Sequence, residues 1–162
     1  MSRKQTPRLP PARNVQPKEH DPYRRRFKTG DAMVCEDCDV VFHHGQWYWG
    51  APPLCDEKGG LCPACQRIRD RYPAGTIRLH RLPEKYRDEV LAMIHNAEER
   101  EKREHPLERL MDIEDKGEEL VVTTTGIHLA RCIAGDLRRR FHGGVEVRYP
   151  KEEQFIQVDW AL

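Results

Sequence analysis

Cys35-Glu-Asp-Cys38 and Cys62-Pro-Ala-Cys65 are the two stretches that decide how this 162-residue chain is organised. Each Cys-x-x-Cys pair can form a tight turn that presents two thiolates to one ion, and two pairs complete a tetrahedral shell. The spacing therefore predicts one site, with Zn²⁺ as the expected ion. A full shell of thiolates leaves no open position, so we expect a structural site rather than a catalytic one. Iron in the same shell and a redox dithiol are the alternatives.

Residues 31–82 surround these cysteines and are expected to form a small zinc-binding module. Alternating apolar residues on both sides of His44-Gly45 indicate a hairpin, and residues 66–71 read as a short helix after the second cysteine pair. A cysteine pair, a hairpin and a second pair that opens a helix together predict a treble-clef-like zinc module. Cys55 and Cys132 lack partners at ligand spacing, so we expect them to lie outside the metal shell.

The remainder of the chain predicts an α+β fold class. Residues 83–105 repeat apolar side chains at helical spacing and are interpreted as a connecting helix, which Pro106 ends. Residues 107–162 contain two strands, an apolar helical stripe from Ile127 to Phe141, and two further strands. This order predicts a small C-terminal ββαββ domain with one helix against a sheet.

Residues 1–30, termed the arm below, differ in composition from the rest of the chain. They hold nine basic and two acidic side chains, although the whole chain has a formal net charge of +1. Five prolines and few large apolar residues predict a disordered arm. Its charge favours contact with phosphates, and the alternative is a solvated tail that binds nothing specific.

Several functional classes lack support in the sequence. No apolar run approaches 18 residues and the first residues lack an apolar signal region, so we expect a cytoplasmic protein that crosses no membrane. The motifs of P-loop and dinucleotide-binding enzymes, serine hydrolases, zinc proteases and deaminases are missing, and we expect no enzyme and identify no small-molecule substrate. Thr123-Thr124-Thr125-Gly126 could hold a phosphate at a helix start, but a helix cap explains it without a ligand.

Basic and aromatic residues gather near the second cysteine pair and in the arm. Basic side chains reach phosphates while exposed aromatics stack on unpaired bases, so this mixture favours RNA. The alternative is that the tryptophans fill the core of the module itself. The expected RNA-binding residues are Arg24, Arg25, Arg26, Lys28, Trp47, Trp49, Arg67, Arg69, Arg71 and Arg78.

Three segments carry a resemblance to a known family: Cys35-x-x-Cys38, Cys62-Pro-Ala-Cys65-Gln-Arg, and the stretch from Leu120 through Arg131. They resemble bacterial short relatives of the large-ribosomal-subunit export adaptor family of archaea and eukaryotes. The larger family has two zinc-binding knuckle sets, whereas this chain has one, so only part of the family pattern applies. The resemblance implies association with ribosomes or structured RNA, with the four cysteines as metal ligands.

The function expected from these features is a non-enzymatic, zinc-stabilised RNA-binding protein. It would associate with the ribosome, in assembly or in the silencing of idle ribosomes. One alternative is a DNA-binding or transcription-associated zinc protein, because the arm would also bind duplex phosphates. Another is a protein-interaction adaptor that binds through its C-terminal α+β domain.

Overall fold

The computed structural model describes residues 22–23, 32–53, 58–150 and 155–162. Almost all of the arm lies outside these ranges, and so do Cys55 and the expected RNA contacts Arg24, Arg25, Arg26 and Lys28. Within the described ranges the fold is mixed α/β, with three helices and two sheets. No helix there combines the length and the apolar character needed to cross a membrane.

The first sheet and the helix after it form what we call the cysteine module. Its strands lie in the order β3-β2-β1-β4, with β1 and β4 parallel and the other pairs antiparallel. His44 and Gly45, both at positive φ, make the expected turn between β2 and β3. The elements are β1 Ala32–Cys35, β2 Val41–His43, β3 Gln46–Tyr48, β4 Lys58–Gly60 and α1 Pro63–Asp70.

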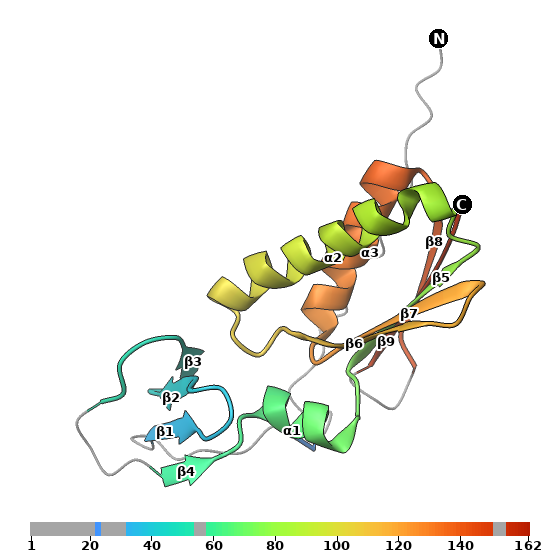
Figure 1. The fold of residues 1–162 in the computed structure, drawn as a ribbon. Coiled ribbons are helices and arrows are strands. Elements are labelled where there is room, and N and C mark those ends of the chain that lie inside the picture. Colours follow the sequence, from blue (N-terminus) through green and yellow to red (C-terminus); the bar gives the residue numbers. More distant parts are fainter. Residues whose placement is uncertain (1–21, 24–31, 54–57, 151–154) are drawn as a thin grey trace.

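The remaining elements form what we call the sheet domain. Its five strands lie in the order β6-β7-β5-β9-β8, and only β5 and β9 pair in parallel. Both helices, α2 and α3, cover the same face of this sheet (Figure 1). The elements are β5 Gly75–His80, α2 Glu84–Glu104, β6 Leu110–Asp115, β7 Glu119–Thr124, α3 Ile127–Phe141, β8 Gly144–Arg148 and β9 Ile156–Ala161.

Buried and more exposed side chains alternate along the strands, so the core lies between one face of the sheet and the helices. On β5, Ile77 and Leu79 are fully buried, whereas Arg78 between them points to the opposite, more exposed face. On α3, side chains at helical spacing, among them Ile133 and Leu137, meet the strands and the buried face of α2. The core is therefore continuous from α2 through α3 to the sheet.

Strand β5 lies at the centre of the sheet domain, although the sequence analysis grouped residues 75–80 with the cysteines. It pairs with β7 on one side and with β9 on the other. Residues 83–105 likewise do more than connect, because Val90 and Ile94 of α2 are fully buried in the same core. The boundary between the two regions consequently lies just before Gly75 rather than at residue 82, and residues 107–162 are only part of the second unit.

Candidate metal centre

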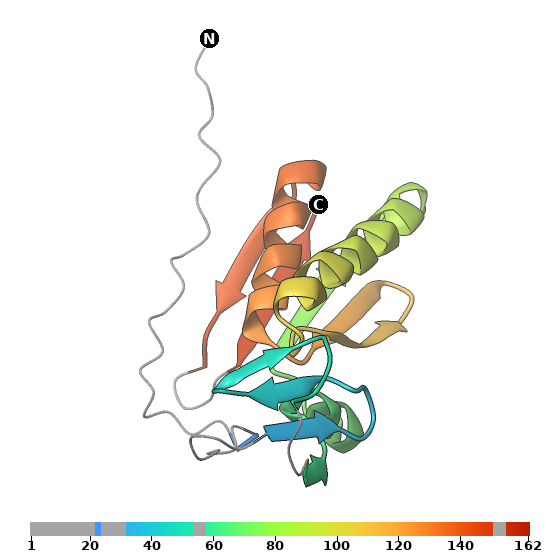
Figure 2. The same ribbon diagram turned by 90° about the vertical axis from the view of Figure 1, so that its left-hand side faces the viewer.

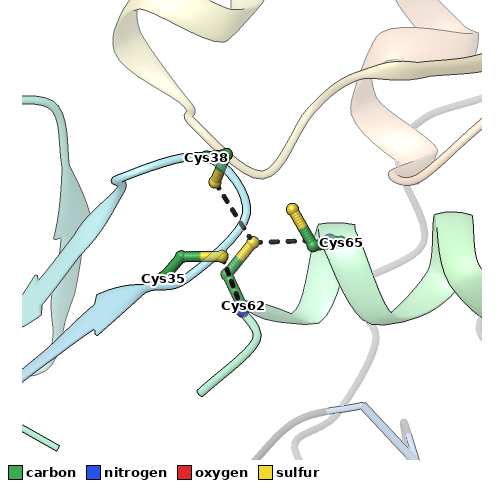
Figure 3. A group of neighbouring side chains, drawn as sticks. All are labelled: Cys35, Cys38, Cys62 and Cys65. Atoms are coloured by element: carbon green, nitrogen blue, oxygen red, sulfur yellow. Dashed lines mark hydrogen bonds between the residues drawn. The ribbon is translucent and has the colours of Figure 1, made fainter. Parts of the chain in front are cut away.

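The four paired cysteines come from two backbone turns that face each other. Cys35 is the last residue of β1 and Cys38 lies in the turn that follows it. Cys62 is the N-cap of α1, and Cys65 lies in the first turn of that helix, after Pro63 at its start. Figure 3 shows the four side chains converging from β1 and its turn on one side and from the start of α1 on the other.

Backbone hydrogen bonds fix the shape of both turns, and two backbone N–H groups donate to sulfur atoms. Asp39, at a φ of 62°, closes the first turn, and its N–H donates to the Cys35 carbonyl over 3.0 Å. The N–H of Cys62 donates to Cys35 Sγ over 3.3 Å, and the N–H of Cys65 donates to Cys62 Sγ over 3.4 Å. Such donors stabilise thiolates, which is the form of cysteine that binds metals.

The spacing of the sulfur atoms fits a single metal ion. All four Sγ atoms lie within 4.8 Å of one another, and Cys38 Sγ lies 3.8 Å from Cys62 Sγ. A tetrahedral zinc site with Zn–S bonds of about 2.3 Å has S–S edges of about 3.8 Å. Cys35, Cys62 and Cys65 are buried, so the cluster is largely shielded from solvent. The prediction that these four cysteines form one cluster able to hold a metal ion is confirmed.

Burial and hydrogen bonding act in opposite directions on the thiols. Burial raises the pKa of Cys65 to about 11 and also raises the pKa of Cys62 well above its ordinary value. Burial opposes ionisation of Cys35 too, but N–H groups of Cys62, Asp37 and Cys38 outweigh it and lower its pKa to about 7. A metal ion must therefore displace protons from Cys62 and Cys65 at neutral pH, and its affinity should fall as the pH falls.

The guanidinium of Arg109, which the sequence analysis did not single out, lies directly against the sulfur cluster. Its Nη2–H donates to Cys38 Sγ over 3.1 Å and its Nη1–H donates to Cys65 Sγ over 3.4 Å. Arg109 is 6% exposed, and its Nε–H donates to the Pro106 carbonyl over 2.8 Å. Burial would lower the pKa of Arg109, but the hydrogen bond to Cys38 and the nearby thiols raise it. A buried positive charge thus faces the site where thiolates would gather.

Trp49 links the cysteine module to both Arg109 and α2. The Arg109 guanidinium lies 5.3 Å from the centre of the Trp49 ring, and the indole N–H donates to the Lys102 carbonyl over 2.8 Å. Leu107 packs against the buried cysteine cluster from the same segment of the chain. Trp49, which is 38% exposed, therefore contributes to the contact between the two regions rather than to the core of the cysteine module.

The described members of the predicted RNA-binding set are distributed over both the cysteine module and the sheet domain. Arg67 is 4% exposed, lies 4.5 Å from the centre of the Tyr23 ring and donates to the Tyr72 carbonyl. Trp47 is half-buried, with its ring 5.0 Å from that of Phe42. Arg67 and Trp47 thus both make contacts within the folded module.

The other three described members of that set are more exposed. Arg78 lies on β5 in the sheet domain, and its Nε is 3.6 Å from a carboxylate oxygen of Glu119. Arg69 pairs with Asp37 over 3.3 Å at the surface of the module. Arg71 is exposed at the C-cap of α1, two residues after Arg69 in the chain. Only Arg69 and Arg71 therefore lie near each other on the cysteine module with their charges toward solvent.

The threonine stretch before α3 is satisfied by the protein itself. Thr125 Oγ1–H donates to the Leu107 carbonyl over 2.6 Å, and Gly126 is the N-cap of α3. The N–H of Leu129, in the first turn, donates to a carboxylate oxygen of Glu108 over 2.8 Å. An internal carboxylate thus occupies the position that a phosphate would take at this helix start. The cap interpretation fits this arrangement without a ligand.

Comparison with protein-family models, with curated proteins and with solved structures finds no match for this chain. Among the described residues, the cysteine cluster is the group of metal-ligand side chains with the greatest burial.

Proposed function

We propose that the four cysteines bind one Zn²⁺ and that the protein is a zinc-stabilised, non-catalytic RNA-binding protein that associates with the ribosome. The observation that carries the metal assignment is the closed set of four sulfur atoms at tetrahedral spacing. Because Cys35, Cys62 and Cys65 are buried and Arg109 covers the cluster, a bound ion would have no coordination position left for a substrate. This supports a structural rather than a catalytic role.

The arrangement of the cysteine module supports a treble-clef-like interpretation. A turn that carries Cys35 and Cys38, the β2–β3 hairpin, and a second pair that opens α1 follow one another in the chain. A zinc ion would join the first turn to α1 and supply on the order of 10 kcal/mol of folding free energy. The guanidinium of Arg109 would offset part of the double negative charge that four thiolates leave around Zn²⁺.

The proposed RNA contact combines the arm with the exposed end of α1. The arm carries nine basic side chains against two acidic ones, which favours phosphate contact that depends on salt and little on sequence. Arg69 and Arg71 lie on a folded module and would add contacts with a defined geometry. The resemblance of the cysteine pairs to relatives of the large-subunit export adaptor family makes the ribosome the preferred partner.

Sedimentation of the tagged protein from a cell lysate tests this proposal. Co-migration with ribosomal particles, lost on nuclease treatment of the RNA, is the expected result. Migration away from ribosomes and structured RNA would overturn the proposal. Co-purification with DNA would then favour the DNA-binding alternative. If the protein associates with neither RNA nor DNA, the protein-interaction adaptor is favoured.

Binding measured against salt concentration, with crosslinking to map the contacted nucleotides, separates the two contact regions. Deletion of residues 1–30 should weaken binding and flatten its salt dependence while the crosslinked site remains. Arg71→Gln should change the crosslinked positions with a small loss of affinity. Arg103→Gln, which removes one charge from an exposed position on α2, is the matched control and should change neither. If the salt dependence of binding is unchanged after the deletion, the arm is a solvated tail that does not contact the RNA.

A further inference from the structure

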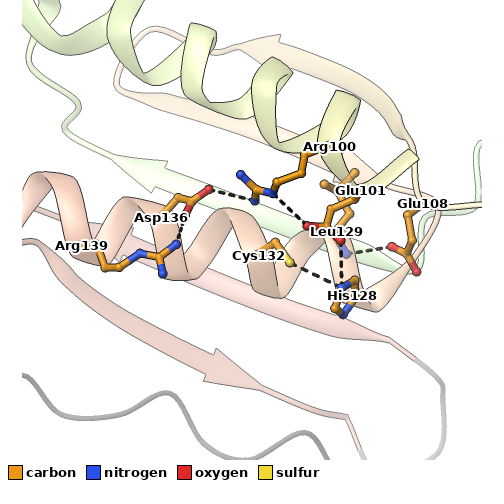
Figure 4. Close-up of polar contacts among 8 residues, drawn as sticks. All are labelled: Arg100, Glu101, Glu108, His128, Leu129, Cys132, Asp136 and Arg139. Carbon is orange, nitrogen blue, oxygen red and sulfur yellow. Dashed lines mark hydrogen bonds and ion pairs between the residues drawn. The ribbon is translucent and has the colours of Figure 1, made fainter. Parts of the chain in front are cut away.

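Two helices of the sheet domain bring a second set of metal-ligand side chains together. Glu101 lies in the last turn of α2 and His105 at its C-cap, four residues later. His128 lies in the first turn of α3, and Cys132 follows four residues later. Residues four apart share one face of a helix, so each helix offers a pair of ligands to the other. Figure 4 shows Glu101 of α2 and His128 and Cys132 of α3 meeting between the two helices.

The distances within this group suit a small cation. Glu101 Oε2 lies 3.0 Å from His128 Nε2, and Cys132 Sγ lies 3.7 Å from the same nitrogen. The rings of His105 and His128 are 5.4 Å apart, and Glu101, His105 and His128 each offer a ligand atom within 4.8 Å of the others. A tetrahedral zinc site has O–N and N–N edges of about 3.4 Å and N–S edges of about 3.6 Å. Cys132 Sγ lies close to His128 but not within 4.8 Å of all three other ligand atoms, so its inclusion in the shell requires side-chain rotation.

The carboxylate of Glu101 is already oriented for such a role. Its side chain is 13% exposed, and its Oε1 accepts a hydrogen bond from Arg100 Nε over 3.2 Å. The Arg100 guanidinium is held in turn by Asp136 over 3.4 Å, which also offsets its positive charge. Oε2 is thereby left facing His128. Such support from behind a ligand fixes its direction and is usual around metal sites.

The group of ligands is partly open to solvent. The side chain of His128 is 55% exposed, so an ion can enter without the helices separating. The carboxyl group of Glu108 lies beside the same helix start, where its Oε2 accepts a hydrogen bond from the Leu129 N–H. A donor set of one oxygen, two imidazole nitrogens and one sulfur matches the preference of Zn²⁺ and chemically similar divalent transition metals, and not that of Ca²⁺ or Mg²⁺.

We propose that Glu101, His105, His128 and Cys132 form a second, independent site for a divalent transition metal of the zinc type. This site differs from the cysteine cluster because two of its ligands are exposed and its donors are mixed. It should therefore bind and release its ion more readily than the enclosed cluster. An ion bound here would fasten the end of α2 to the start of α3. The alternative is an ion pair between Glu101 and His128 that binds no metal.

Titration of the full-length, metal-free reduced protein with Co²⁺ distinguishes these possibilities. Co²⁺ in a site of four thiolates gives intense sulfur-to-metal absorption, whereas a site with one thiolate gives a weaker band, so the two equivalents can be told apart. We expect the unaltered chain to bind two equivalents of Co²⁺, one at each site. His128→Ala and Cys132→Ser should each raise the dissociation constant of the weaker equivalent at least about tenfold and leave the four-thiolate band unchanged. His95→Ala, at an exposed position on α2, is the control and should keep both equivalents.

The proposal is overturned if the unaltered protein shows no band beyond that of the four-thiolate site. It is equally overturned if His128→Ala and Cys132→Ser keep the second equivalent at full affinity. Thermal unfolding provides a check that does not depend on absorption. Zn²⁺ added at a concentration near the dissociation constant of the second site, to protein already loaded at the cysteine cluster, should raise the unfolding temperature of the unaltered chain and of His95→Ala more than that of Cys132→Ser. Absence of the four-thiolate band alone would count against the proposed function and not against this second site.

Discussion

The cysteine module and the sheet domain are held together by different means. The apolar cluster around the metal centre contains five buried residues, of which three are cysteines. The core of the sheet domain contains seventeen, drawn from three strands and both covering helices. The second core can stabilise its fold by apolar burial alone, whereas the first is too small to do so. Cross-linking by the proposed metal ion would therefore take the place of core volume in the cysteine module, where few apolar residues are available.

The two regions nevertheless meet at one junction. Arg109 receives support from the sheet-domain side, where its backbone N–H donates to Thr125 Oγ1 over 2.9 Å, and its guanidinium reaches the sulfur atoms. Trp49 crosses in the opposite direction, from the cysteine module to the Lys102 carbonyl of α2. Figure 2 shows the smaller sheet lying beside the end of α2 and below the larger one. A change at the metal centre should therefore be felt in the sheet domain through few contacts.

The largest expected effect concerns β5 and tests where one region ends. A fragment of residues 107–162 should not fold, because it lacks the strand that pairs with both β7 and β9 and would leave two separate hairpins. A fragment of residues 74–162 should fold and unfold cooperatively whether or not zinc is present. Circular dichroism with thermal unfolding measures both. A folded 107–162 fragment would show that the C-terminal ββαββ segment is sufficient by itself.

A smaller effect, confined to the cysteine module, is expected on loss of the metal. Cys62→Ala should abolish the four-thiolate metal site and unfold residues 32–70, at a cost on the order of 10 kcal/mol in zinc-dependent stability. Amide chemical shifts of β5 to β9 should change little, except next to Arg109. Cys55→Ala is the control and should retain the metal. Elemental analysis together with nuclear magnetic resonance measures both, and a folded, reduced protein without metal would contradict the assignment.

The smallest of the three effects tests the junction. Arg109→Met keeps the apolar stem but leaves the zinc-bound thiolates without their buried cation, so the free energy of unfolding should fall by about 3 kcal/mol. Zinc should still bind, and a chelator should remove it faster. Arg103→Met, at an exposed position on α2, should change stability by less than about 0.5 kcal/mol. A chelation rate equal to that of the unaltered protein would show that Arg109 does not stabilise the bound metal.

The sequence predicted the cysteine cluster because the information is local. Each Cys-x-x-Cys turn is closed by backbone bonds between neighbouring residues, such as that from Asp39 to Cys35. The sequence analysis named no strand at residues 75–80, although Ile77 and Leu79 alternate with polar residues there. Nor could it assign these residues to the larger sheet, because both partner strands lie far along the chain. Proximity to Cys65 in sequence proved a poor guide to proximity in the fold.

Arg109 and Arg67 show what spacing alone does not reveal. Arg109 lies 44 residues after Cys65 and precedes a strand, so nothing nearby marks it as a neighbour of the sulfur atoms. Arg67 and Arg69 look equivalent in a short basic helix, yet the first is buried beside Tyr72 and the second lies at the surface. The difference arises from which side of α1 meets the rest of the protein, and eight helical residues carry too little periodicity to tell.

Because β5 pairs with β9 near the end of the chain, the two regions can fold at different times during synthesis. All four cysteines are made before β5 is complete, so the proposed metal centre could assemble on the nascent polypeptide as soon as Cys65 emerges. The larger sheet must wait, since its central strand acquires its second neighbour only when residues 156–161 have been added. This long-range closure makes the sheet domain the slower part to mature. Until β9 has been made, one edge of β5 is unpaired. The cysteine module, once folded around the proposed zinc ion, would be the folded region that precedes this strand in the chain.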